Sequence, residues 1–241
     1  MALVVEAKGI VKAYGGVRAL NGLDLVLGGG RIDGIIGPNG AGKTTLFNVL
    51  TGFARPEEGH TLFDGRPIDA LSPHARARIG LVRSFQLLEL LPALTVGEVL
   101  TTAALLHESL TDARRQARAL CDDLDLPWGL GSADLTPGEV RRLELGRCMA
   151  ARPRVLLLDE IMAGLTAPDA EFMMERIRAL QRRGVAVVVV EHVMDVVRSL
   201  CDHVHVLAAG RIIAAGSFDA VAADPRVVEA YFGARRRQGA A

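Results

Sequence analysis

The hydrophobic positions of this chain fall into short continuous runs that alternate with longer segments of mixed polarity. The clearest runs are residues 31–36, 155–158 and 185–190. Segments 168–183 and 194–200 follow the second and third runs and have the periodicity of helices. Short apolar strands that alternate with helices are typical of a parallel sheet covered on both faces. We therefore predict an α/β fold with a mostly parallel core sheet.

The beginning of the chain has the pattern of an antiparallel sheet instead. We predict strands at 3–7 and 9–13, an alternating strand at 23–27, and a hairpin-like region at 60–68 around Asp64-Gly65. A helix is expected at about 43–50. Near the other end, residues 203–215 predict a hairpin that turns near Ala209-Gly210, followed by a last helix to Tyr231.

The middle of the chain is rich in Leu, Ala, Arg and Asp, and residues 96–126 have helical periodicity. We interpret residues 87–133 as a helical subdomain inserted into one domain that spans 1–233. Residues 1–86 and 134–233 would then form the catalytic core with its β subdomain. The arginine-rich end, 234–241, is predicted to be a flexible tail.

Composition narrows the classes of protein that are possible. Half of the 241 residues are hydrophobic, which favours a large buried core, and 28 basic residues balance 28 acidic ones. A neutral chain has no electrostatic surplus for nucleic acid, so we expect no nucleic-acid partner. No apolar run approaches the roughly 20 residues of a membrane-spanning helix. We therefore expect a cytosolic location and attachment to any membrane through a partner.

The strongest local motif follows the first apolar run. It consists of Gly37, Pro38, Asn39, Gly40, Ala41, Gly42, Lys43 and Thr44, and Thr45 comes next. This is the G-x-x-x-x-G-K-[ST] pattern of a P-loop, in which backbone N–H groups and a helix N-terminus surround phosphates. Lys43 would reach the β- and γ-phosphates, and the Thr44 hydroxyl would hold Mg²⁺. A simple glycine-rich turn explains neither the lysine nor the threonine, so we predict an ATP site.

Two carboxylates end the second apolar run. Asp159 is expected to reach Mg²⁺ near the phosphates, and Glu160 to act as the general base for an attacking water. A solvated Asp-Glu pair at the end of a strand is the alternative, and the phosphate loop makes it the weaker one.

The segment Leu135-Thr136-Pro137-Gly138-Glu139, about 20 residues before Asp159, resembles the L-S-G-G-Q signature loop of ABC-type ATPases. The resemblance extends from about Leu3 to Gly233. It implies that Thr136, Gly138 and Glu139 contact the γ-phosphate of an ATP molecule held by a second subunit. It also implies that Tyr14 stacks on adenine and that Gln86 contacts Mg²⁺ and water. His192 matches the switch histidine near the γ-phosphate, and residues 163–166 match a dimer-contacting loop.

Within that family the chain is most similar to ATP-binding subunits for uptake of branched-chain or other hydrophobic amino acids. The stretches that carry this likeness are residues 83–86, 94–100, 142–149 and 159–165, together with the ending at 228–233. The resemblance implies a second ATPase subunit, membrane-spanning permease subunits and, indirectly, an extracytoplasmic substrate-binding protein. It places the chain on the cytoplasmic face of the cell membrane.

Other functions remain open at this point. Subunits for urea uptake or lipopolysaccharide export have similar sequences, and a soluble ABC ATPase acting on DNA, ribosomes or iron–sulfur assembly is a different class. A nucleotide sensor that does not hydrolyse ATP is disfavoured because Glu160 and His192 are both present. Thr136 stands where the family usually has serine and keeps the hydroxyl. Four other positions depart further from the family pattern: Pro137 and Glu139 in the signature loop, Ile161 in place of proline, and Thr166 in place of aspartate.

Overall fold

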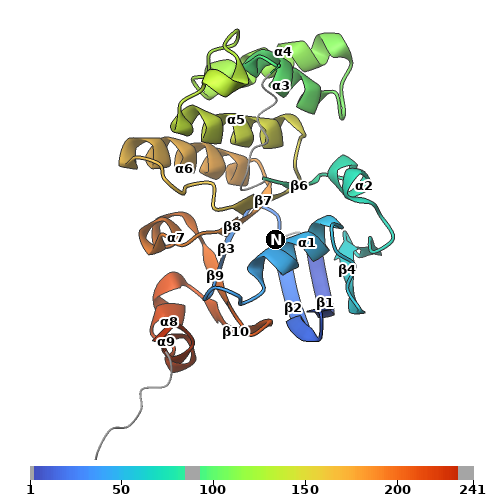
Figure 1. Ribbon diagram of the computed structural model, residues 1–241, viewed down its shortest axis with the longest axis vertical. Coiled ribbons are helices and arrows are strands. Elements are labelled where there is room, and N and C mark those ends of the chain that lie inside the picture. The colour runs from blue at the N-terminus through green and yellow to red at the C-terminus, as the bar shows by residue number, and fades with distance from the viewer. Residues whose placement is uncertain (1–2, 85–92, 233–241) are drawn as a thin grey trace, which may run out of the picture.

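The structure is a computed structural model that describes residues 3–84 and 93–232. Gln86 and the predicted tail lie outside the described residues. Helices and strands are arranged along one long axis, with α3 and α4 at one end of the molecule and α8 and α9 at the other (Figure 1). Two sheets lie between these ends.

The larger sheet has six strands in the order β10-β9-β3-β8-β7-β6. Its strands are β3 (Ile32–Ile36), β6 (Leu81–Arg83), β7 (Val155–Asp159), β8 (Ala186–Val190), β9 (His203–Ala208) and β10 (Arg211–Gly216). All neighbouring pairs are parallel except the edge pair β10–β9, which is the predicted C-terminal hairpin. The predicted α/β fold with a mostly parallel core sheet is confirmed.

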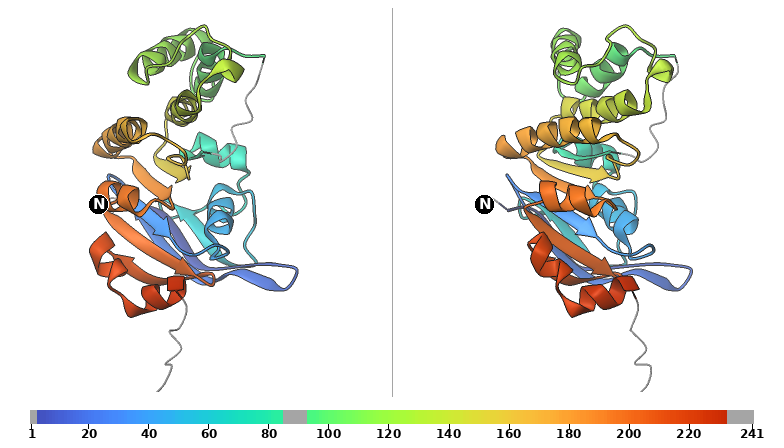
Figure 2. Two further views of the ribbon diagram at one scale, coloured as in Figure 1. Left: turned by 60° about the vertical axis from the view of Figure 1, so that its left-hand side comes forward. Right: turned by 90° about the vertical axis from the view of Figure 1, so that its left-hand side faces the viewer.

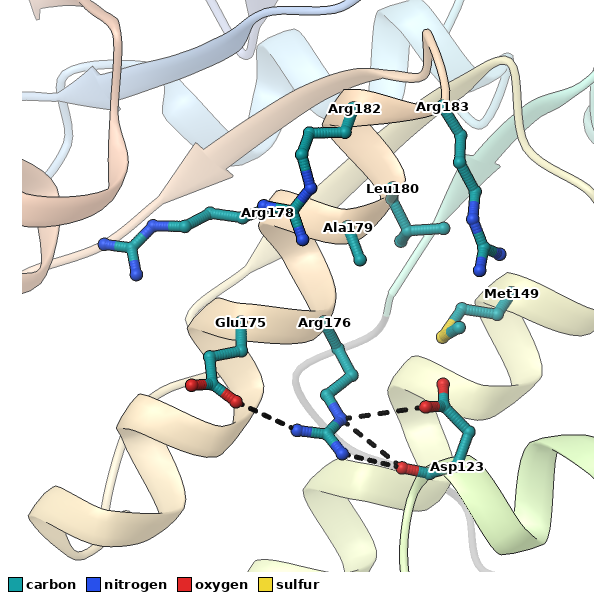
Figure 3. A pocket seen from close by; sticks show the side chains of 9 residues that line it. All are labelled: Asp123, Met149, Glu175, Arg176, Arg178, Ala179, Leu180, Arg182 and Arg183. Carbon is teal, nitrogen blue, oxygen red and sulfur yellow. Dashed lines mark hydrogen bonds and ion pairs between the residues drawn. The ribbon is translucent and has the colours of Figure 1, made fainter.

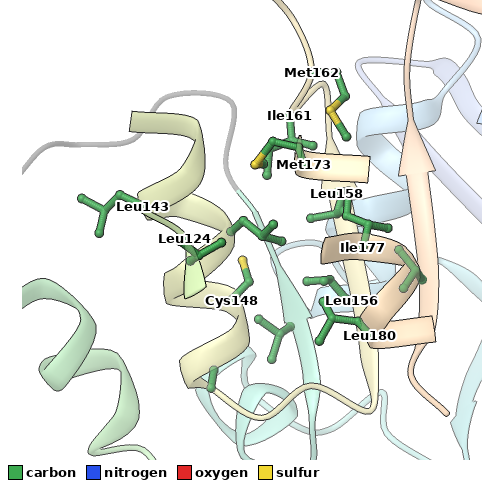
Figure 4. Packing of buried hydrophobic residues seen from close by; sticks show 14 of the residues in the cluster. Leu124, Leu143, Cys148, Leu156, Leu158, Ile161, Met162, Met173, Ile177 and Leu180 are labelled. Atoms are coloured by element: carbon green, nitrogen blue, oxygen red, sulfur yellow. The ribbon is translucent and has the colours of Figure 1, made fainter. Parts of the chain in front are cut away.

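The side chains of this sheet alternate between two hydrophobic clusters. Leu156 and Leu158 pack with the helices α5 (Pro137–Ala150) and α6 (Ala167–Arg182), as Figure 4 shows. Val155 and Leu157 face the other way and join the cluster that contains α1 (Lys43–Thr51). Every residue of β3, β7 and β8 is buried, because both faces are covered. This double burial holds the carboxyl ends of the strands in place, since each buried Leu contributes about 1.5–3 kcal/mol.

The smaller sheet is antiparallel, with strand order β2-β1-β4-β5. It consists of β1 (Leu3–Tyr14), β2 (Val17–Gly28), β4 (Glu58–Phe63) and β5 (Arg66–Pro67). The prediction of two separate strands at 3–7 and 9–13 is wrong, because one strand runs through both. Its register with β2 shifts between Ala7 and Ile10, and Gly9 adopts φ 59° at this irregularity. A β-bulge of this kind interrupts the alternating pattern without ending the strand.

Three helices form the end of the molecule farthest from the C-terminal helices. These are α3 (Val96–Ala104), α4 (Leu110–Asp123) and α5, which pack against one another (Figures 1 and 2). Helix α5 begins beyond residue 133, so the division of the chain at that residue stays a prediction. Helix α2 (Pro73–Arg78) and strand β6 were not predicted, since each is too short to have a clear periodicity.

The last described helices are α7 (Met194–Leu200), α8 (Phe218–Ala222) and α9 (Pro225–Phe232), which pack beside β9 and β10. Within the described residues, no helix is both long enough and apolar enough to cross a bilayer.

Candidate functional site

A cavity of about 430 Å³ opens where the phosphate loop meets the ends of β7 and β8. It is lined by Ala19, Asn39, Gly40, Ala41, Gly42, Lys43, Thr44, Thr45, Glu160 and His192. The structure thus brings the predicted phosphate loop together with the predicted base and the predicted switch histidine. They meet because β3, β8 and β7 are parallel neighbours, so residues that follow these strands share one edge of the sheet.

The phosphate loop is held against the rest of the chain at two glycines. Gly42 has φ 109°, and a Cβ at this position would lie 2.3 Å from the backbone oxygen of Ala19. A Cβ on Gly37 would lie 2.0 Å from the backbone oxygen of Leu207. Neither position has room for another side chain, and Gly42 has a backbone conformation that favours glycine. The glycines therefore allow the loop to curl tightly at the start of α1.

Lys43 is buried and turns back across its own loop. Its Nζ donates to the backbone oxygens of Gly37, at 2.7 Å, and Pro38, at 3.1 Å. Burial lowers the pKa of Lys43 from its usual value, while the nearby carboxylates of Glu160 and Asp159 act to raise it. A buried ammonium between two carboxylates and a loop of backbone N–H groups is a suitable cation for a polyphosphate chain.

Asp159 is buried at the end of β7 and is held by two neighbours. Its Oδ2 accepts from Arg83 at 2.7 Å, and its backbone N–H donates to the Ser84 hydroxyl at 3.0 Å. The same guanidinium donates to Asn48 Oδ1 at 2.6 Å, which links α1 to β7 through β6. The carboxylate of Asp159 and the hydroxyl of Thr44 are hard oxygen donors, the ligand type that Mg²⁺ prefers, so the residues fit this ion.

Glu160 and His192 are in direct contact. His192 Nε2 lies 2.8 Å from Glu160 Oε1, with both side chains partly exposed to the cavity. Glu160 also has an unusual backbone conformation, with φ 52°. A non-glycine residue in this region carries a strain of about 1–3 kcal/mol, which persists only where its surroundings impose it. A carboxylate beside an imidazole can accept a proton and stay correctly oriented.

The N-terminus of α5 is a separate feature, and it lies on the other side of α6 from α1 (Figure 1). Thr136 and Glu139 form a capping box. Glu139 Oε2 accepts from the Thr136 backbone N–H at 2.8 Å and from its hydroxyl at 2.7 Å. These bonds lower the pKa of Glu139, so it is ionised at neutral pH. Gly138 follows Pro137, which occupies the first helical position, where a missing N–H costs least.

The remaining predicted site residues lie outside the cavity lining. Tyr14 ends β1 with half of its surface exposed, and Lys12 Nζ lies 5.2 Å from the centre of its ring. Ile161 is buried in the cluster between β7 and α6, so it acts as a core residue. Thr166 caps α6, and its hydroxyl donates to Asp169 Oδ2 at 2.7 Å.

A second cavity of about 420 Å³ lies beside α6, away from the phosphate loop (Figure 3). Its lining includes Arg176, Arg178, Arg182 and Arg183. Arg176 donates to the Asp123 backbone oxygen at 3.1 Å, and Arg178 to the Ser199 backbone oxygen at 2.9 Å. These bonds tie helices together, which makes the two arginines structural.

The whole arrangement has counterparts among known proteins. Residues 20–163 match the family described as "ABC transporter", which is more than half of the chain. The chain belongs to the ABC transporter family of ATP-binding cassettes. It is therefore an ATP-binding and ATP-hydrolysing subunit that powers a transporter. Residues 211–236 also match a family described as "Branched-chain amino acid ATP-binding cassette transporter".

Individual relatives cover nearly the full length of this cassette. It is 32% identical to the probable branched-chain amino acid transport ATP-binding protein LivG of Archaeoglobus fulgidus, over 96% of both chains. It is 35% identical to the high-affinity branched-chain amino acid transport ATP-binding protein BraF of Pseudomonas aeruginosa, over 95% of this chain and 98% of that one. The crystal structure of a nucleotide-free ATP-binding cassette from an ABC transporter superimposes with a TM-score of 0.87 at 30% identity, covering 96% of this chain and 100% of that chain.

Our sequence reasoning missed three residues around the cassette's site. Ala19 contributes a backbone oxygen, so its side chain carried no signal. Arg83 and Glu191 could have been recognised from their positions, because each is a charged residue at the end of a buried strand. Charged groups at such ends are buried only where they have a partner, and this rule could have identified both.

The capping box of α5 leads to a testable prediction, because the family resemblance predicts that ATP held by a second subunit contacts this helix N-terminus. An ionised Glu139 should repel that phosphate. We expect Glu139→Gln to lower the ATP concentration for half-maximal dimerisation about 5-fold, because one like charge at close range costs about 1 kcal/mol in water. Glutamine also serves in capping boxes, so the helix should remain intact. Light scattering at increasing ATP concentration measures this.

Helix α3 offers a matched control for this prediction. Thr95 and Glu98 form the same box, with Glu98 Oε2 at 2.8 Å from the Thr95 backbone nitrogen. Glu98→Gln in the purified cassette should leave ATP-driven dimerisation unchanged. Equal shifts in both variants, or none in Glu139→Gln, would show that the α5 box does not face ATP.

Proposed function

We propose that this cassette powers the uptake of branched-chain or other hydrophobic amino acids across the cell membrane. The observation that carries this proposal is the likeness to two relatives named for branched-chain amino acid transport, over at least 95% of each chain. The match of residues 211–236 to a branched-chain amino acid family supports it independently, because it lies outside the general cassette match at 20–163.

In this proposal two cassettes bind two ATP molecules between them. The cavity beside Lys43 would hold the phosphates of one ATP, and Thr136, Gly138 and Glu139 of the other subunit would cover them. Support comes from the placement of α5. It lies on the other side of α6 from α1 (Figure 1), whereas α1 contributes Lys43, Thr44 and Thr45 to the cavity lining. Two anion-binding features on separate parts of one chain can both act on ATP only if two chains meet.

The predicted site residues, in the cavity lining and beyond it, then have distinct chemical roles. Lys43 and the backbone N–H groups of residues 39–45 would neutralise the phosphate charge, and Tyr14 would stack on the adenine. Thr44 and Asp159, with Gln86, would hold Mg²⁺, which supplies charge neutralisation at the β- and γ-phosphates. Glu160 would accept the proton of the attacking water. His192 would keep that carboxylate oriented through the 2.8 Å contact and move with the γ-phosphate.

The cassette would work at the cytoplasmic face of the membrane, attached through permease subunits. The neutral balance of 28 basic and 28 acidic residues supports a protein partner over nucleic acid. An extracytoplasmic binding protein would contact the permease and not the cassette. The cargo is therefore chosen by other chains.

Co-purification tests the transport role. Tagged Glu160→Gln cassette with ATP should capture multi-span membrane proteins from solubilised native membranes, together with a binding protein for hydrophobic amino acids. Mass spectrometry identifies the partners, and the matched control is tagged Lys43→Ala, which should capture less because its ATP-dependent closure is impaired.

Other outcomes of this experiment contradict the proposal. Capture of a binding protein for urea, or of components of lipopolysaccharide export, would support the role as a transporter subunit but show that the cargo is different. Capture of only soluble proteins, ribosomes or nucleic acid would contradict amino-acid uptake altogether.

A further inference from the structure

Glu191 is a buried carboxylate directly next to the site, and the proposed mechanism gives it no role. It follows β8 and precedes His192, and only 2% of its surface is exposed. Its Oε1 accepts from the backbone N–H of Met162 at 2.9 Å, and this bond is buried. Burial raises the pKa of Glu191, while the Met162 bond opposes that shift. A carboxylate removed from water in this way needs a specific partner.

The partner belongs to the turn that carries Glu160. The Glu160 backbone N–H donates to Val190 O at 2.9 Å, and its carbonyl accepts from Ala163 at 3.2 Å. These bonds close the turn and join it to β8, with Glu160 at φ 52°. The bond from Met162 to Glu191 adds a side-chain attachment between the same two segments. Together they impose a backbone conformation that Glu160 would otherwise leave.

We propose that Glu191 is a positioning residue whose carboxylate clamps the Met162 N–H, and with it the Glu160 turn, against the strand end that carries His192. The backbone of Glu191 positions His192, and its side chain positions Glu160 through the Met162 N–H. One residue therefore sets the 2.8 Å spacing between Glu160 and His192. This inference rests on the roles proposed above for those two residues.

The hydrogen bond between Glu191 and Met162, the clamp, also affects the loop that follows Met162. Leu165 N–H donates to Met162 O at 3.2 Å, so the residue held by Glu191 is also the one that starts the turn toward α6. The segment 163–166, predicted to contact the second subunit, therefore begins at the clamp. A displacement of Met162 would move both the base and this loop.

Two variants of the full chain test the proposal. Glu191→Ala removes the acceptor and should lower kcat for ATP hydrolysis about 10- to 100-fold, because small misplacements of a catalytic group have effects of this size. The Kd for ATP should stay within about twofold, since the phosphate loop keeps its contacts. Glu191→Gln retains an acceptor oxygen and should recover kcat to within about threefold of the unaltered chain. Amide exchange at Met162 should become faster in the alanine variant only.

Asp202 provides a matched control. Its carboxylate accepts a backbone N–H, that of Ile32, at 2.8 Å, at the end of β3 opposite the phosphate loop. Asp202→Ala should leave kcat unchanged. An equal loss in this variant, equal losses in the two Glu191 variants, or normal kcat in Glu191→Ala would overturn the proposal. Glu160→Gln, measured alongside, separates this inference from the proposed function. Normal hydrolysis by Glu160→Gln would contradict the role of Glu160 as general base. Amide exchange at Met162 in the Glu191 variants would still test whether Glu191 holds the turn.

Discussion

Glu160→Gln should reduce ATP hydrolysis by about 10²- to 10⁴-fold, the usual contribution of a general base. Glutamine has the same shape and can still contact His192 Nε2, which lies 2.8 Å from Glu160 Oε1. It cannot accept a proton from water at neutral pH. ATP binding should remain within about twofold, because in our proposal the phosphate contacts come from the phosphate loop and not from Glu160. Phosphate release and equilibrium ATP binding, measured on the same preparation, check both parts.

Glu175→Gln is the control for this variant. Glu175 lies on α6 with 61% of its side chain exposed and pairs with Arg176 at 3.2 Å. Its substitution should leave hydrolysis unchanged, since exposed ion pairs contribute little. Hydrolysis by Glu160→Gln at the normal rate would show that another group activates the water.

Lys43→Ala should weaken ATP binding about 10- to 150-fold, because hydrogen bonds to charged groups contribute about 1.5–3 kcal/mol. Hydrolysis should fall further, because in our proposal this ammonium also stabilises the charge that develops on the γ-phosphate. The variant also loses the bonds to Gly37 O and Pro38 O, which should loosen the loop. Isothermal titration with ATP measures the affinity, and phosphate release measures turnover.

Lys8→Ala is the matched control, since Lys8 is exposed and pairs across the surface with Glu6 at 2.7 Å. It should bind ATP normally. If Lys43→Ala keeps normal affinity while losing turnover, Lys43 acts in the transition state and not in binding, which contradicts the first part of the prediction.

The residues of the site were easier to predict from the sequence than the contacts between them. Glu160 could be named from the strand that precedes it, because a charged residue after a buried apolar run marks the edge of a parallel sheet. His192 was named from the family resemblance. Their direct contact depends on β7 and β8 being neighbours, with Asp159 paired to Val190. Strand order and register arise from packing across the whole sheet, so one sequence does not reveal them.

The same distinction applies to elements of the fold. Strand β6 has three residues and exists because Leu81, Val82 and Arg83 pair with β7. Strand β1 was divided in two by our prediction because Lys8 and Gly9 interrupt its pattern, whereas pairing with β2 and β4 carries it through the bulge. Pairing partners far away in the chain decided both outcomes.

The sequence by itself determined the phosphate loop, the buried parallel strands and the helix-capping residues, since each depends on neighbours within a few positions. Tertiary structure decided which charges meet. Arg83 binds Asp159 across 76 residues, and Glu191 binds the Met162 N–H across 29. The carboxylates of Asp159 and Glu191 are both buried, and a buried charge is stable only where the fold supplies its partner. Local patterns set where the chemistry can lie, and the packed sheet sets the distances at which it acts.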